Sequence, residues 1–229
     1  AAVVVLVTLW LSGGPAFALF GMGLAAWLFV GSILEWSGRI KLFREPIGTS
    51  LRRMRNLPRS AHGTMLAHAG VAIVVAGITG SQAWTEEAVQ SLAVGESTEL
   101  AGHTFILSGI REYQGPNYAA REAEITITTP GERTVVLTPE KRVYTVEGMP
   151  TTEAGIQSSF TGDIYAVIGD QDESGKWITR FYVKPLIPWM WFGGLVMVFG
   201  GLMSLSDRRY RIGAPTRSHK TAAKAVPAE

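Results

Sequence analysis

The chain lacks cysteine altogether, and charged residues make up only 17% of its 229 positions. Without thiols it can form neither disulfides nor thiolate metal sites, and it has no cysteine nucleophile. Charge is entirely absent from three long runs, at 16–34, 60–84 and 185–206. A membrane-spanning helix needs about 20 mostly apolar residues. These runs exclude a simple soluble globular protein and predict a chain that crosses a membrane.

We place three complete spans at 16–36, 61–84 and 185–206. The apolar run 1–11 is too short to span, and no basic start or small-residue cleavage site accompanies it, as a signal peptide requires. We interpret 1–11 as the end of a truncated membrane helix, followed by a tight turn at 12–15.

The basic residues are concentrated in two short segments that flank the spans. Seven Lys/Arg and one acid lie in 37–59, and six Lys/Arg and two acids lie in 207–229, whereas 85–186 has a formal charge of −7. Short basic segments beside spans stay in the cytoplasm. We therefore expect a basic cytoplasmic loop at 37–59, a basic cytoplasmic tail at 207–229 and the acidic segment on the other side. Because the basic runs adjoin spans, we expect no nucleic-acid partner.

The acidic segment has the pattern of a β domain, which we place at 85–184. Runs rich in β-branched and apolar residues alternate with Pro/Gly/Asp turns, although 152–160 could form a short helix. The runs predicted as strands are 103–110, 122–128, 134–137, 142–146, 164–168 and 177–183. The expected fold class is a multi-span α-helical membrane protein with an inserted all-β domain, either a small barrel or a sandwich.

His68 is the residue most indicative of chemistry, because it lies inside the second uncharged run. An ionisable group in hydrocarbon is costly and is by default a functional candidate. A neutral imidazole is also a common axial ligand of haem iron. A buried histidine bonded to a neighbouring helix carbonyl is the other interpretation, and the residues alone leave both open. The small neighbours Ala67, Ala69, Gly70 and Ala72 would leave room for a planar group.

The other three histidines do not form a site with His68. His62 lies six residues away at the membrane edge, about 240° around a helix, so the two cannot bind one metal from one face. We expect His62 to be an interfacial residue and His103 to lie at a strand edge, while His219 falls in the polar tail. Four scattered histidines do not make a zinc site.

Glycines recur every seven residues in two of the spans, at 63, 70 and 77 and again at 193 and 200. Small residues on one face allow helices to pack closely. A flat cofactor against the same face is the alternative. Trp189 and Trp191 stand where tryptophans commonly anchor a span at the membrane interface.

The chain resembles the C-terminal part of cytochrome c maturation protein F, the CcmF family of haem lyase subunits. Each matching motif is weak alone, but their order and spacing are specific. The motifs are MLAHAG at 65–70, GSQAW at 80–84, GPNY at 115–118, PEKRVY at 139–144, DIY at 163–165, and YVKP at 182–185 running through the last span to DRR at 207–209.

This resemblance implies a component of the enzyme that attaches haem covalently to apocytochrome c at the periplasmic face. It implies a bacterial inner membrane location, a periplasmic β domain and, as partners, a periplasmic haem chaperone, apocytochrome c and other cytochrome c maturation subunits. It also implies a haem b with two intramembrane histidine ligands, of which His68 matches one by its motif. The second ligand, the catalytic residues and the tryptophan-rich haem-handling segment are expected upstream of this chain.

Two other functions stay open on the residues alone. The chain could be a non-catalytic, membrane-anchored assembly protein whose outer β domain docks partner proteins. It could also be half of a transporter, but the spans lack the charged or broken-helix features that transporters carry at the membrane midplane.

Overall fold

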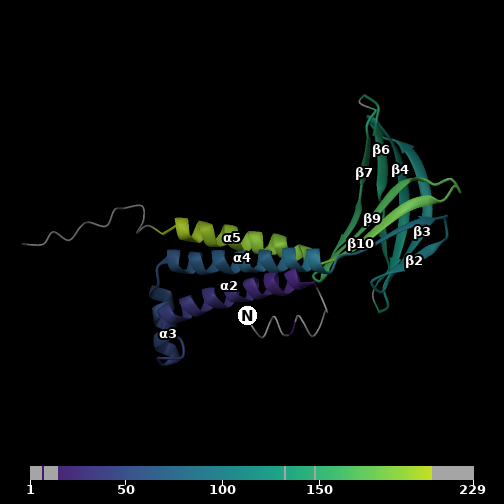
Figure 1. Cartoon of the computed structure of the whole chain (residues 1–229). Helices are drawn as coiled ribbons and strands as arrows, with labels where there is room; N and C mark the ends of the chain where they lie inside the picture. The colour runs from purple at the N-terminus through teal and green to yellow at the C-terminus, as the bar shows by residue number, and fades with distance from the viewer. Residues whose placement is uncertain (1–6, 8–14, 132, 147, 208–229) are drawn as a thin grey trace, which may run out of the picture.

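Three long helices lie side by side, and a β-sandwich extends from one end of them (Figure 1). The structure is a computed structural model that describes residues 7, 15–131, 133–146 and 148–207. The helices are α2 (Ala16–Ile40), α4 (Arg59–Ala83) and α5 (Ile187–Leu205), and all three are long and apolar enough to cross a membrane. The expectations for 1–11, apart from residue 7, and for the tail beyond Asp207 lie outside the described residues.

Helices α4 and α5 pack through their glycines. A Cβ added to Gly70 would lie 2.7 Å from the carbonyl oxygen of Gly193, and one on Gly200 would lie 2.6 Å from the backbone nitrogen of Ala67. Contacts this short are possible only without side chains. The close-packing interpretation is confirmed. Because α5 covers this face and buries Ala69 and Gly70, the cofactor alternative for the glycine face is wrong.

A carboxylate links α4 and α5 at the end of the bundle away from the sandwich. Asp207, just beyond α5, accepts a hydrogen bond of 3.0 Å from the backbone N–H of Ser60 in the first turn of α4. A negative charge is favourable there because the free N–H groups give a helix N-terminus a partial positive charge.

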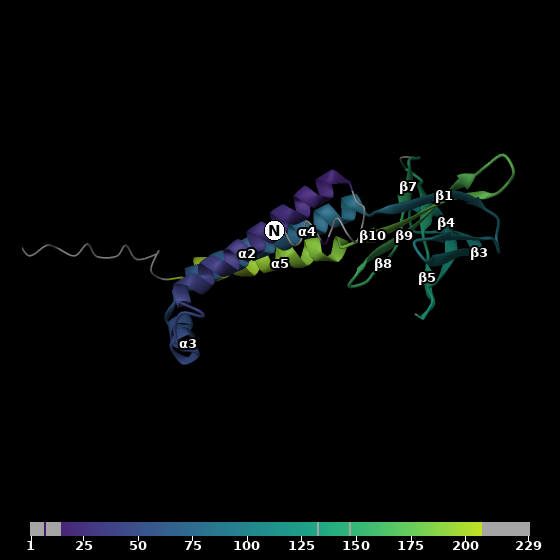
Figure 2. The same cartoon turned by 60° about the horizontal axis from the view of Figure 1, so that its bottom comes forward.

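The segment between α2 and α4 contains a helix, α3 (Ile47–Asn56), where the charge pattern indicated only a loop. Lys41 and Phe43 adopt left-handed backbone conformations, with φ of 56° and 65°, and these end α2 and turn the chain. Both views show α3 at the end of the bundle opposite the sandwich and turned across the bundle axis (Figures 1 and 2).

The β domain is a sandwich of two antiparallel sheets, so the sandwich alternative is confirmed over the barrel. One sheet has the order β1-β10-β9-β8, and the other has the order β2-β3-β4-β6-β7 with β5 beside β4. The bounds are β1 (Glu86–Leu92), β2 (Ser97–Leu100), β3 (His103–Gln114), β4 (Tyr118–Thr128), β5 (Val135–Leu137), β6 (Glu140–Tyr144), β7 (Pro150–Glu153), β8 (Gly155–Ser158), β9 (Gly162–Gln171) and β10 (Trp177–Pro185).

Alternate residues of the central strands fill the space between the two sheets. Phe105 of β3 stacks on Phe181 of β10 across the sandwich, with ring centroids 4.5 Å apart, and both are fully buried. Leu107, Ile125 and Ile168 are also fully buried around them. The short helix suggested for 152–160 is wrong, because this stretch forms parts of β7 and β8, and β8 pairs with β9 in a hairpin.

The sandwich joins the bundle with almost no linker. β10 ends at Pro185 and α5 begins at Ile187, and Leu186 between them has φ of 62° and donates its N–H to the Thr161 carbonyl. Trp189 of α5 donates its indole N–H to the Phe160 carbonyl at 3.0 Å and packs edge-on against the Phe160 ring. Trp189 therefore contacts the sandwich, which its predicted role as an interfacial anchor did not include.

Candidate functional site

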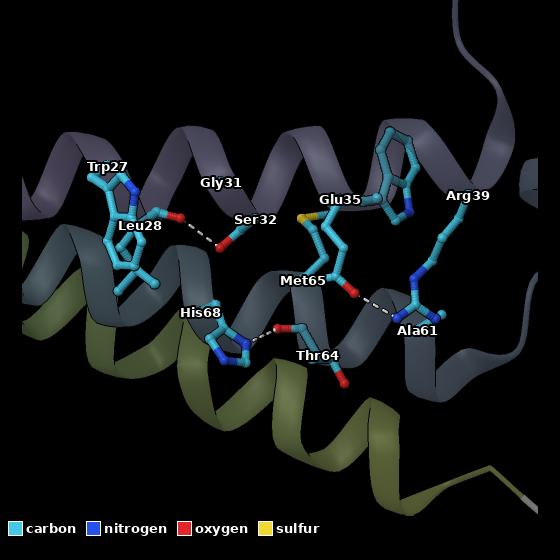
Figure 3. A pocket seen from close by; sticks show the side chains of 11 residues that line it. Trp27, Leu28, Gly31, Ser32, Glu35, Arg39, Ala61, Thr64, Met65 and His68 are labelled. Carbon is cyan, nitrogen blue, oxygen red and sulfur yellow. Dashed lines mark hydrogen bonds and ion pairs between the residues drawn. The ribbon is translucent and has the colours of Figure 1, made fainter. Parts of the chain in front are cut away.

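A groove between α2 and α4 contains His68 and forms a cavity of about 220 Å³. Along it, Figure 3 shows Trp27 and His68 toward one end and the pair of Glu35 and Arg39 toward the other. The lining residues are Trp27, Leu28, Gly31, Ser32, Glu35, Trp36, Arg39, Ala61, Thr64, Met65 and His68.

His68 is oriented through its own helix. Its Nδ1 lies 2.8 Å from the carbonyl oxygen of Thr64, one turn earlier. A carbonyl can only accept, so Nδ1 carries the proton and the neutral ring keeps its lone pair on Nε2. One interpretation of the sequence placed a bonding partner of His68 on a neighbouring helix, but the partner lies on α4 itself. The bond to Thr64 still fixes the tautomer and ring orientation, as such bonds do for metal-bound histidines.

The Nε2 side of the ring is open. His68 is exposed, and within the described part of the chain the Thr64 carbonyl is its one hydrogen-bond partner. The earlier alternative, a buried histidine bonded to another helix, does not fit this geometry. A neutral imidazole with an open, oriented nitrogen on an apolar helix surface can act as a monodentate metal ligand.

The two ends of the groove differ in chemistry. At the His68 end, Trp27 is 65% exposed and offers a large aromatic surface beside Leu28. At the other end, an Arg39 Nη lies 2.5 Å from a Glu35 carboxylate oxygen, and both side chains are more than half exposed. The groove is therefore aromatic and apolar at its His68 end and carries a carboxylate and a guanidinium, paired with each other, at the opposite end.

His62 is structural. The indole N–H of Trp36 donates to its Nδ1 at 3.0 Å, and its Nε2 lies 3.1 Å from the Met54 carbonyl, to which it donates. Both ring nitrogens are therefore engaged. His62 links α2, α4 and the end of α3, and it has no lone pair left for a metal.

Among the described residues, no further histidine lies beside His68. His103 begins β3, as expected for a strand-edge residue, and its Nδ1 lies 2.6 Å from the Thr129 hydroxyl. His219 lies outside the described residues. Among the residues whose placement is described, no group of three or more His, Asp or Glu side chains could hold a metal ion.

The structure brings two of the β-domain motifs together. The 115–118 motif forms the turn between β3 and β4, and the 139–144 motif runs into β6, which pairs with β4. The Tyr118 ring lies 5.6 Å from that of Tyr144, and the Arg142 guanidinium lies 4.7 Å from the Tyr118 ring centre. We call Tyr113, Tyr118, Tyr144 and Arg142 the tyrosine cluster.

Hydrogen bonds around Glu140 hold this cluster in place. Tyr113 donates its hydroxyl to Glu140 at 2.9 Å, and this bond raises the pKa of Tyr113 to about 12. Arg142 donates to the other carboxylate oxygen, and that bond is the main cause of the lowered pKa of Glu140. A nearby positive charge and hydrogen bonds to the ionised carboxylate both lower the pKa of a carboxyl group.

The β domain matches a known protein family. Residues 83–185 match the family described as the CcmF C-terminal beta-sandwich. The β domain is a CcmF sandwich. The resemblance to the C-terminal part of CcmF is thereby confirmed for this domain, and the relatives extend it along the chain.

The chain is 42% identical over its whole length to the cytochrome c-type biogenesis protein ccl1 of Rhodobacter capsulatus, of which it covers 34%. It is 35% identical over 92% of its length to the cytochrome c-type biogenesis protein CcmF of Escherichia coli, covering 31% of that protein. A solved structure named cytochrome c heme lyase CcmF shares the fold over 90% of this chain, with a TM-score of 0.69 at 24% identity, and the chain covers 33% of it. The chain thus spans about a third of these CcmF-type relatives.

The sequence pattern indicated His68 but not the rest of the groove. Trp27, Glu35, Trp36 and Arg39 all lie on α2, which no motif pointed to. One signal was available, because Glu35 and Arg39 are four residues apart at the end of an otherwise uncharged helix, where they can pair.

Proposed function

We propose that the chain acts as a component of the cytochrome c haem lyase and takes part in covalent attachment of haem to apocytochrome c at the periplasmic face. The open Nε2 of His68, on an apolar helix beside an aromatic groove, is the observation that carries the proposal. The names of the relatives, which are cytochrome c-type biogenesis proteins and a heme lyase, support it.

In this proposal His68 is one axial ligand of a haem b within the membrane. The residues present fit that group in two respects: His68 offers an oriented nitrogen and Trp27 an aromatic surface. Bound haem iron would supply redox chemistry. The cavity of about 220 Å³ is below the size of most ligand pockets. The site is therefore half of one, with the second histidine on another helix of the full-length protein.

We further propose that the three helices span the bacterial inner membrane and that the sandwich is periplasmic. The sandwich and the basic 37–59 segment lie at opposite ends of the bundle (Figure 1), as the positive-inside rule requires of this topology. Reporter fusions test this topology. Alkaline phosphatase should be active when fused within the β1–β2 turn and inactive when fused within 41–46, and the reverse pattern would overturn it.

The sandwich is then the docking surface for the periplasmic haem chaperone, apocytochrome c or other maturation subunits. The tyrosine cluster favours this role, because aromatic and arginine side chains are enriched where proteins bind one another. The same observation supports the second candidate, a non-catalytic assembly protein that docks partners without binding haem.

The absorption spectrum of the purified full-length protein distinguishes the two. His68→Ala should lose the haem Soret band, and His68→Gly supplied with imidazole should recover part of it. His62→Ala is the matched control, since both of its nitrogens are engaged elsewhere, and its haem content should stay largely unchanged. A stably inserted His68→Ala protein with full haem content would leave only the assembly function.

A further inference from the structure

Helix α3 presents two of its three large apolar side chains, Ile47 and Leu51, outward, while Met54 is half-buried. Ile47 is 81% exposed and Leu51 is 53% exposed, and residues four apart lie on the same helix face. Phe43, in the turn before α3, is 95% exposed. A helix of a soluble protein does the opposite and buries its apolar stripe.

The polar side of α3 is the one that packs on the protein. Ser50 is buried and donates its hydroxyl to the Lys41 carbonyl at the end of α2. Arg53 lies 2.9 Å from Glu45, which also pairs with Lys41. These contacts fix which face of α3 turns inward, so the outward position of Ile47 and Leu51 is built into the fold.

Basic side chains border the apolar face. At 100° per residue, Arg55 lies about 40° and Arg52 about 100° from Leu51 around the helix. Both are exposed, as are Arg44 before α3 and Arg59 after it. Within the described residues, none of these four arginines has an ion-pair partner. Glu45 is the one acidic residue in 37–59, and it is already paired.

The location of α3 determines what it can reach. Six residues separate it from the end of α2 and two from the start of α4, and both neighbours are apolar enough to cross a membrane. It also lies across the axis of these helices (Figure 2). A helix held at the end of a bundle and turned across it runs along the surface of the membrane that the bundle spans.

We propose that α3 is an interfacial helix that inserts Phe43, Ile47 and Leu51 among the acyl chains and binds anionic phospholipid headgroups through Arg44, Arg52, Arg55 and Arg59. An apolar face flanked by arginine is the composition of helices that lie in a membrane interface. Each Lys or Arg near an anionic leaflet adds about 1 kcal/mol of attraction, and arginine also binds phosphate through two hydrogen bonds. The helix thereby fixes the depth of α2 and α4, and so of His68, in the bilayer.

Single thiols can test this, because the chain has no cysteine of its own. Leu51→Cys and Asn56→Cys are made in the full-length protein, with any thiols elsewhere replaced by serine, and each is labelled with an environment-sensitive dye. The proteins are reconstituted in phosphatidylcholine with and without phosphatidylglycerol. Ile47→Cys is a second reporter on the apolar face, and Asn56 is the matched exposed position on the polar side.

The dye at position 51 should be quenched severalfold more by spin-labelled acyl chains, and severalfold less by aqueous iodide, than the dye at 56. Phosphatidylglycerol should strengthen this contrast, and Arg52→Gln together with Arg55→Gln should reduce the strengthening, because only Arg44 and Arg59 then remain to bind the headgroups. Equal iodide access at 51 and 56 would place the helix in water. Protection of position 51 from both quenchers would mean that protein covers it, and no effect of phosphatidylglycerol would remove the headgroup site. Each of these results overturns the proposal.

Discussion

The contact between α4 and α5 makes a sharp prediction about two adjacent glycines. A Cβ on Gly193 would lie 2.8 Å from the Gly70 carbonyl oxygen and equally close to the backbone nitrogen and a methyl carbon of Val74, where ordinary contact begins at 3.4 Å. A Cβ on Gly194 would meet nothing within 4 Å. Gly193→Ala must therefore push α4 and α5 apart, while Gly194→Ala changes nothing that packs.

The difference in unfolding free energy between the two variants isolates the cost of overpacking, because both substitutions lie in the same helix and in the same local sequence. Alanine favours a helix over glycine by about 1 kcal/mol, and this gain applies to both. Overpacking costs about 1–3 kcal/mol, and this cost applies only at Gly193. The free energy of unfolding of Gly193→Ala should therefore fall about 1–3 kcal/mol below that of Gly194→Ala.

Reversible unfolding in mixed detergent and dodecyl sulfate, followed by loss of helical circular dichroism, measures this difference. It should be accompanied by a weaker haem signal in Gly193→Ala, because the displaced helix carries His68. If the two variants unfold within about 0.5 kcal/mol of each other, the ordinary scatter of surface substitutions, the reasoning about glycine packing fails.

Other predictions concern the sandwich. Residues 85–184, excised, should give a β-type circular dichroism spectrum and a cooperative melt, since they bury their own core, and a disordered or helical spectrum would contradict this. The Ser174 hydroxyl is the main cause that lowers the pKa of Asp172 from 3.8 to about 2. This contribution to stability is present above pH 3.8 and lost as the pH falls through about 2; the melting temperature should therefore drop in that window, and Asp172→Asn should flatten the drop. Trp189→Phe removes the bond to the Phe160 carbonyl and should cost about 0.5–1.5 kcal/mol in full-length unfolding, whereas an unchanged stability would show that the bond does not join sandwich and bundle.

Much of the architecture could be predicted from the sequence because membrane spans and buried strands carry strong signals. A long run without charged residues can be recognised without knowing how the helices pack. Strands such as β4 and β10 place apolar residues at about every second position. β7 and β8 were missed because their residues are mostly polar and five of the eight are exposed. Their strand conformation comes from pairing with β6 and β9, which no local pattern encodes.

The candidate site was likewise only partly predictable from the sequence. His68 stood out because an ionisable residue in an uncharged run is rare. Its neighbours on α2 did not, because they depend on how α2 and α4 are aligned, and that alignment depends on the close approach of Gly21 to Thr79. The tautomer of His68 was equally hidden, because the Thr64 carbonyl that fixes it belongs to the backbone and has no sequence signature.

The one-residue connection at Leu186 couples the sandwich closely to the helix bundle. A strand runs into a helix across a single residue held in a left-handed conformation, a state that costs a non-glycine residue about 1–2 kcal/mol and tolerates little rotation. A partner that tilts the sandwich cannot bend the chain there, so the tilt is transmitted as rotation of α5. Because α5 is locked to α4 glycine against glycine, the rotation reaches the helix that carries His68. The sandwich and the helix that carries His68 are therefore joined by a one-residue connection and a close-packed pair of helices, and not by a flexible linker.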